Sequence, residues 1–119
     1  MVSVNAVQDC LVPRAIAQEV RRVVVEALGN AGRHAHAKTI EVGLRRDGRQ
    51  VLVSVADDGR GMDLGGQDSP SAPHFGLDIM RLRAAAIGGY LEIRSEPGCG
   101  TEVTLRWPGT TRARRPPGC

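Results

Sequence analysis

The chain has 119 residues, which is enough for one domain with a single modest core. Its formal net charge of +3 comes from Arg112, Arg114 and Arg115 near the carboxyl end, because the remaining basic and acidic residues balance at 13 each. Only 3% of the residues are aromatic, which leaves few rings for stacking on bases. We therefore expect no nucleic acid partner.

Three scattered cysteines are too few for a disulfide framework or a zinc site. An odd, sparse count fits a reducing compartment, so we expect a cytoplasmic location. The sequence has no apolar run near the roughly 18 residues of a membrane-spanning helix, and residues 1–8 do not form a signal peptide. Any membrane attachment of the parent protein would come from chain outside these residues.

The first half of the sequence predicts a strand, a long helix and a hairpin. Residues 2–6 alternate weakly as a first strand, and Pro13 opens a helical pattern that runs through about residue 35. Alternating runs at 40–44 and 51–55 flank Asp47-Gly48, which predicts a β-hairpin with a tight turn. The apolar positions of the helix recur at three- and four-residue steps: Ile16, Val20, Val23, Val24, Ala27, Leu28 and Ala31.

The second half predicts a loop, a helix and another hairpin. Residues 62–75 are rich in glycine, serine and proline and are long enough for a binding lid. A helix then runs from Gly76 to the Gly88-Gly89 pair, and two alternating strands follow. Its expected buried positions are Leu77, Met80, Ala84 and Ile87, and those of the strands are Leu91, Ile93, Val103, Leu105 and Trp107.

This order of elements predicts one α/β (α+β) two-layer sandwich over residues 1–109, with a mixed, mostly antiparallel sheet. Residues 110–119 are basic and proline-rich, and we expect a disordered tail there. The sequence contains no internal repeat.

Two groups of polar residues stand out from these apolar patterns. On the first helix, Glu26, Asn30 and Arg33 form a stripe about 110° from the apolar one. Such a flank is usually a solvated edge, but asparagine is a poor residue for a helix interior and its presence indicates a function. Asp57 and Asp58 stand where an alternating strand ends, which is a usual place for ligands in layered α/β domains.

Four stretches resemble the ATPase domains of histidine kinases, gyrase and Hsp90. Residues 26–35 (EALGNAGRHA) look like the N box, 57–61 (DDGRG) like the G1 box and 98–101 (GCGT) like the G2 box. Residues 76–89 are most similar to the nitrate-sensor and DesK/DosS-like subfamily of sensor histidine kinases. The resemblance covers about residues 14–108 and implies a Bergerat-type ATP-binding fold, with about three helices on one face of the sheet.

The resemblance implies ATP and Mg²⁺ as ligands. Asp57 would accept the amino hydrogen of adenine, and Gly59 and Gly61 would leave room for the base. Asn30 would give an amide oxygen to magnesium, and Arg33 would meet a phosphate. Further nucleotide-binding candidates are His34, Gly76, Leu77, Gly98, Gly100 and Thr101. Ordinary turn roles stay open for Asp57 and residues 98–101, and a packing role stays open for His34.

Glu26 is the candidate catalytic residue. In hydrolytic relatives, a glutamate four residues before the asparagine that binds magnesium activates water. A kinase should suppress this hydrolysis of ATP. We favour a role in positioning or polarising a group near the γ-phosphate, with a general base as one form of it. A purely structural Glu26 is the alternative.

The expected function is that of the catalytic domain of a two-component sensor histidine kinase. Its γ-phosphoryl group would pass to a histidine on a separate dimerisation segment and reach a response regulator indirectly. Residues 1–12 are too short for the dimerisation segment, and none of His34, His36 and His74 precedes the N box on a helix, so we expect ATP binding without autophosphorylation. Because the dimerising helices are absent from these residues, we expect a monomer. It looks like an excised domain or a protein without its phosphoacceptor half. A regulatory nucleotide-binding module without transfer and an anti-sigma-type serine kinase are the alternatives.

Overall fold

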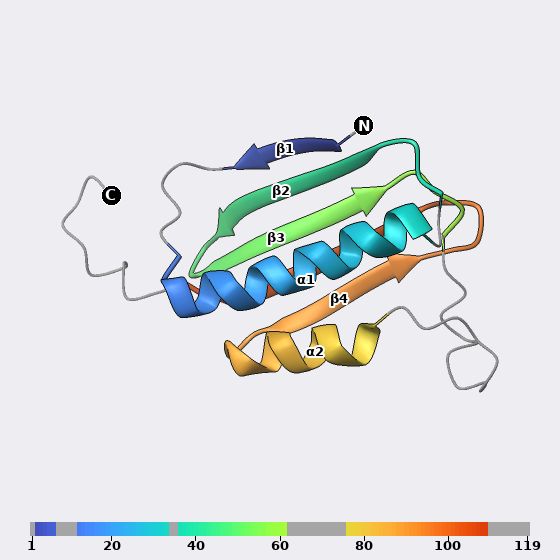
Figure 1. Cartoon of the computed structure of the whole chain (residues 1–119). Coiled ribbons are helices and arrows are strands. Elements are labelled where there is room, and N and C mark those ends of the chain that lie inside the picture. The colour runs from blue at the N-terminus through green and yellow to red at the C-terminus, as the bar shows by residue number, and fades with distance from the viewer. Residues whose placement is uncertain (1, 7–11, 34–35, 62–75, 110–119) are drawn as a thin grey trace.

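The computed structural model describes residues 2–6, 12–33, 36–61 and 76–109 (Figure 1). The expected lid at 62–75, the tail at 110–119, His34 and His74 lie outside these residues. In chain order the elements are β1 (Val2–Ala6), α1 (Arg14–Arg33), β2 (Ile40–Asp47), β3 (Gln50–Asp57), α2 (Leu77–Ala86), β4 (Tyr90–Ser95) and β5 (Thr101–Pro108).

The strands form one sheet in the order β1-β2-β3-β5-β4. β1 runs parallel to β2, and every other neighbouring pair is antiparallel, which confirms the predicted mixed, mostly antiparallel sheet. The register aligns one residue from each strand in a single row across the sheet: Val2, Ile40, Asp57, Thr101 and Ser95. This row, which we call the Asp57 row, marks the end of the sheet at which β3 terminates.

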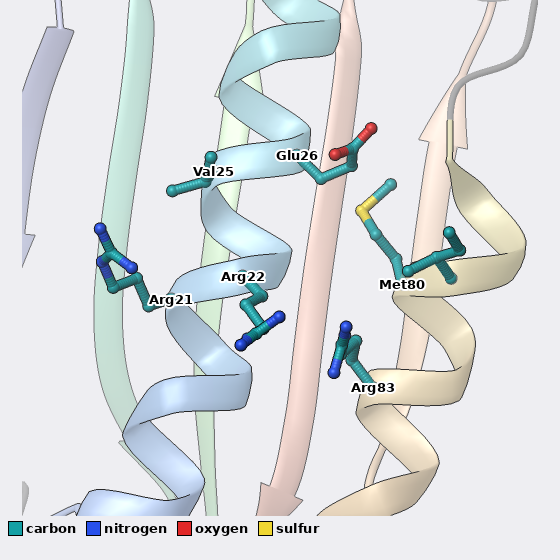
Figure 2. Close-up of a pocket in the computed structure, with 7 residues that line it drawn as sticks. Arg21, Arg22, Val25, Glu26, Met80 and Arg83 are labelled. Carbon is teal, nitrogen blue, oxygen red and sulfur yellow. The ribbon is translucent and has the colours of Figure 1, made fainter.

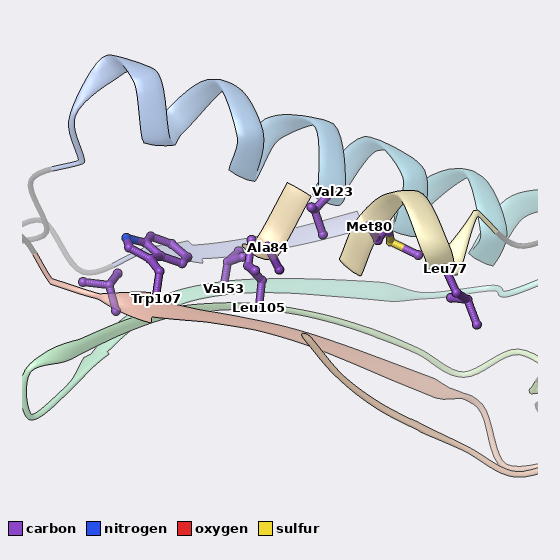
Figure 3. Packing of buried hydrophobic residues seen from close by; sticks show 8 residues of the cluster. Val23, Val53, Leu77, Met80, Ala84, Leu105 and Trp107 are labelled. Atoms are coloured by element: carbon purple, nitrogen blue, oxygen red, sulfur yellow. The ribbon is translucent and has the colours of Figure 1, made fainter. Parts of the chain in front are cut away.

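Both helices lie on the same face of the sheet (Figures 1 and 3). The resemblance implied about three helices, and the described residues contain two. α1 begins directly after Pro13, whose carbonyl accepts the N–H of Ala17 at 2.8 Å, and it extends to Arg33, while the expected helix end near residue 35 lies outside the described residues. None of the helices in these residues is long and apolar enough to cross a membrane.

The core fills the space between the helices and this face of the sheet (Figure 3). Alternation along β5 turns Val103, Leu105 and Trp107 inward, and Leu105 and Trp107 are no more than 1% exposed. α1 buries Val23, Ala27 and Ala31 from its predicted apolar stripe, while the stripe's other members are partly buried. The alternation and helical periodicity in the sequence therefore identified the core face correctly.

An ion pair also joins the two helices. Nη1 of Arg83 in α2 lies 3.1 Å from Oε1 of Glu19 in α1, and both side chains are partly buried. Together with the buried Met80 and Leu77, this pair fixes α2 beside α1.

Candidate functional site

Asp57 is the last residue of β3 and is half-buried between β2 and β5. Its Oδ1 accepts the N–H of Gly59 at 2.8 Å, so the turn after the strand orients the carboxylate. None of the described residues donates a hydrogen bond to Oδ2 of Asp57. A ligand with a hydrogen-bond donor, such as an amino group on a base, can therefore use this oxygen.

Asp58 turns toward the residues that precede β2. Its Oδ1 accepts the N–H groups of Lys38 at 2.8 Å and Thr39 at 2.9 Å, and its Oδ2 accepts the Thr39 hydroxyl at 2.8 Å. The Asp58 N–H in turn donates to the Thr39 carbonyl at 3.3 Å. Hydrogen bonds from Thr39 and Lys38 hold the pKa of Asp58 below its ordinary value because they favour the charged carboxylate.

The turn between β4 and β5 packs against the turn that follows Asp57. A Cβ on Gly100 would run into the carbonyl oxygen of Asp57, and a Cβ on Gly61 would run into that of Glu96. The Gly98 N–H donates to the Arg60 carbonyl at 2.5 Å. In the structure the missing side chain of Gly61 lets two turns approach closely, and its expected place beside a base stays a prediction.

Thr101 lies beside Asp57 in the Asp57 row and is only 7% exposed. Its hydroxyl forms a hydrogen bond of 2.7 Å with the Ser95 hydroxyl on β4. This contact joins the two ends of the β4–β5 turn, so Thr101 supports the turn that packs on Asp57.

Asn30 and Arg33 occupy the carboxyl end of α1 and differ in burial. Asn30 is 5% exposed, whereas the Arg33 side chain is 63% exposed and folds back over Gly29. The amide oxygen of Asn30 is a hard donor of the kind that Mg²⁺ accepts. No group of three or more histidine, cysteine or acidic residues in the described part of the chain could hold a metal. Magnesium here would therefore depend on Asn30 together with phosphate and water oxygens.

Glu26 lies one turn before Asn30, and its carboxylate is directed from α1 toward α2 (Figure 2). It rests against Gly76, where an added Cβ would lie 2.5 Å from Oε1, and Nη2 of Arg33 is 4.0 Å away. Glu26 also lines a cleft of about 440 Å³ between the helices. The other residues that line the cleft are Arg21, Arg22, Val25, Ile79, Met80 and Arg83.

The sequence-predicted residues thus form two groups. Asp57, Gly59, Gly61, Gly98, Gly100 and Thr101 gather at the end of the sheet, and Glu26, Asn30, Arg33 and Gly76 lie where α1 meets the start of α2. The Leu77 side chain is buried in the core cluster. Sequence reasoning found no role for Asp58 and missed Thr39, because a contact between residues 19 positions apart leaves no periodic signal.

Comparison with known proteins identifies the family. Residues 15–111 match the histidine kinase-, DNA gyrase B- and HSP90-like ATPase family. The chain belongs to this family. This match confirms the family that the sequence resembles, and we assign ATP as the ligand.

Two sensor proteins are similar over most of this chain. Sensor histidine kinase LiaS of Bacillus subtilis is 33% identical over 102 residues, which cover 86% of this chain and 28% of LiaS. Sensor protein VraS of Staphylococcus aureus is 32% identical over 105 residues, which cover 88% of this chain and 29% of VraS. The chain therefore spans less than a third of the length of these relatives.

Solved structures share the fold. The blue-light activated histidine kinase of Erythrobacter litoralis EL346 is 29% identical with a TM-score of 0.73, covering 94% of this chain and 36% of that one. The ATP binding domain of PrrB from Mycobacterium tuberculosis has a TM-score of 0.68 over 92% of this chain and 82% of its own. At 23% identity, the PrrB domain supports the fold alone. The predicted α/β class is thereby confirmed.

Proposed function

We propose that this chain is the ATP- and magnesium-binding catalytic domain of a two-component sensor histidine kinase. It donates the γ-phosphoryl group of ATP to a histidine on a separate dimerisation segment. The observation that carries this proposal is the Asp57 carboxylate at the end of β3, with Oδ1 engaged by Gly59 and Oδ2 available to a base. Phosphoryl transfer in such a domain rests on positioning and charge stabilisation.

The side chains take separate roles in this proposal. Asp57 binds the adenine amino group, Asn30 gives an oxygen to Mg²⁺, and Arg33 meets a phosphate. Glu26 positions or polarises a group near the γ-phosphate, since its carboxylate already lies beside Gly76 at the start of α2. The remaining residues shape the nucleotide site: His34, Gly59, Gly61, Gly76, Leu77, Gly98, Gly100 and Thr101.

The finer assignments belong to the same proposal. The domain spans residues 1–109. We assign it to the nitrate-sensor and DesK/DosS-like subfamily because the sequence of residues 76–89 resembles that subfamily. The cytoplasm is its location, because its few cysteines fit a reducing compartment. Its direct partner is the phosphoacceptor segment, and a response regulator follows indirectly.

Nucleotide titration tests the proposal. Asp57→Asn should weaken ATP and ADP binding alike, by about tenfold to a hundredfold or more, because a charged hydrogen-bond acceptor for the base is lost. Asn30→Ala should weaken only the magnesium-dependent part of ATP binding. Calorimetric titration with and without Mg²⁺ measures both effects.

A matched control is Asp47→Asn, because Asp47 is exposed and ends β2 at the opposite end of the β2–β3 ladder from Asp57. This variant should bind both nucleotides as the wild type does. Unchanged ADP affinity in Asp57→Asn would contradict the assignment of the base-binding residue.

A further inference from the structure

Residues 37–39, which lead into β2, contact two separate parts of the site. The Ala37 N–H donates to the Ala31 carbonyl at 3.0 Å, and Ala31 is the buried neighbour of Asn30 on α1. The next two residues, Lys38 and Thr39, donate to the Asp58 carboxylate. This short segment therefore connects the end of α1 to the end of β3.

Four hydrogen bonds join Asp58 to Lys38 and Thr39, and we call this set the Asp58 clamp. Hydrogen bonds to a charged carboxylate are stronger than bonds between neutral groups. The lowered pKa of Asp58 keeps the carboxylate ionised well below neutral pH. Because the contribution of a carboxylate with a lowered pKa is complete above its unfolded pKa, the clamp is fully formed in a binding experiment at pH 7.

The clamp restrains the end of β3, and with it Asp57, on the side that faces β2. On the β5 side, the Asp57 carbonyl is held by close packing against Gly100. On the β2 side, the pairing of Ile40 with Asp57 is the last in the ladder, and Asp58 provides the next contacts through its side chain and its N–H. Without the clamp, the β2 side of the strand end would be free to open.

We propose that Asp58, acting with Thr39, is a positioning residue that fixes the Asp57 carboxylate relative to the end of α1 that carries Asn30. This inference rests on the proposed function, in which Asp57 binds the base and Asn30 binds magnesium. Loss of the clamp should displace the base-binding carboxylate and leave the phosphate contacts of α1 in place. Affinity for an adenine nucleotide should therefore fall more than affinity for a guanine nucleotide.

The test compares ADP with GDP. Adenine presents an amino donor where guanine presents a carbonyl acceptor, so a correctly placed carboxylate favours ADP. In the 119-residue chain at pH 7 with Mg²⁺, Asp58→Asn should weaken ADP binding about tenfold while GDP affinity changes little. Thr39→Val should cause a smaller loss of selectivity in the same direction, and Thr39→Ser, which keeps the hydroxyl donor, should restore it.

Two controls separate positioning from general damage. Thermal unfolding of each variant shows whether it is folded at the temperature of the titration, and Asp47→Asn should keep the wild-type selectivity. If the clamp is the cause, Asp58→Asn combined with Thr39→Val should lose no more selectivity than Asp58→Asn alone.

The outcomes are distinct. An unchanged ratio of ADP affinity to GDP affinity in Asp58→Asn, including equal losses for both nucleotides, would overturn the inference. ADP binding by the wild type would still support the proposed function in that case. A wild-type chain that binds neither nucleotide would overturn the proposed function itself. If Asp58→Asn does not fold, the Thr39→Val and Thr39→Ser pair decides the question by the same ratio.

Discussion

At Gly76 the chain enters α2 with a φ of 70°, and the Glu26 carboxylate fills the space that a side chain would need. Alanine at this position would adopt a left-handed conformation at a cost of about 1–2 kcal/mol and would also displace Glu26. We expect Gly76→Ala to lower the free energy of unfolding by about 1–3 kcal/mol in urea denaturation. Adding Glu26→Ala should recover the steric part and leave the backbone part.

The control for this prediction is Gly32→Ala on α1. Nothing lies within 4 Å of a Cβ built at Gly32, and its backbone is helical, so alanine should be neutral or stabilise by up to about 1 kcal/mol. A Gly76→Ala protein as stable as the wild type would contradict both the left-handed backbone at Gly76 and its contact with Glu26.

The burial and packing of some single residues could not be predicted from the sequence. Asn30 was placed on a polar stripe with Glu26 and Arg33, yet it is buried while those two side chains are 40% and 63% exposed. Its burial depends on how α1 packs, which the spacing of residues along one helix does not encode. Similarly, the close approach of another turn to Gly61 could not be predicted, because that turn comes from residues about 35 positions later.

At the scale of elements, α2 is held mainly by one buried face. Met80 is 1% exposed and sits in the core cluster with Val23 and Leu105. We expect Met80→Ala to destabilise the protein by about 2–5 kcal/mol, because it removes buried apolar contacts and leaves a cavity. Urea denaturation monitored by circular dichroism would measure this loss.

Ile79, the preceding residue on α2, supplies the matched control. It is 58% exposed, so Ile79→Ala should change stability by no more than about 0.5 kcal/mol. Equal losses in the two variants would mean that α2 is not oriented with Met80 toward the sheet.

Most elements could be predicted from the sequence because their period shows in the residue order. The β2–β3 hairpin, the inward residues of β5 and the buried face of α2 all follow simple alternation or helical spacing. The order of strands in the sheet and the contacts of Asp58 join residues that are distant in sequence, so no local pattern reveals them. The family resemblance supplied the ligand, and the structure supplied the positions of the groups around it.

At the scale of the whole molecule, the nucleotide site and the phosphate acceptor belong to different segments in our proposal. We expect the 119-residue chain alone to bind radiolabelled ATP and to incorporate no phosphate. Addition of a two-helix segment with a phosphoacceptor histidine should give acid-labile phosphate on that segment. Positioning of ATP by this domain is required for the transfer, so Asn30→Ala should reduce the labelling.

Acid stability of the product distinguishes the alternatives. Acid-stable phosphoserine on a partner would contradict the histidine kinase assignment, and tight ATP binding without transfer to any supplied histidine segment would favour a regulatory module. Labelled product is analysed before and after mild acid treatment, with Asp47→Asn as the control variant.

The Asp57 row has a consequence for how this domain can be joined to others. Val2 belongs to that row, two strands from Asp57 and hence about 10 Å away, whereas Pro108 ends β5 about 23 Å from it. A module fused ahead of Val2 starts at the Asp57 end of the sheet, and one fused after Pro108 starts at the opposite end. The effective concentration of a tethered acceptor helix depends on whether its linker spans this distance. If the nucleotide binds at Asp57 as we propose, we expect an amino-terminal fusion to need a shorter linker than a carboxyl-terminal fusion to reach it.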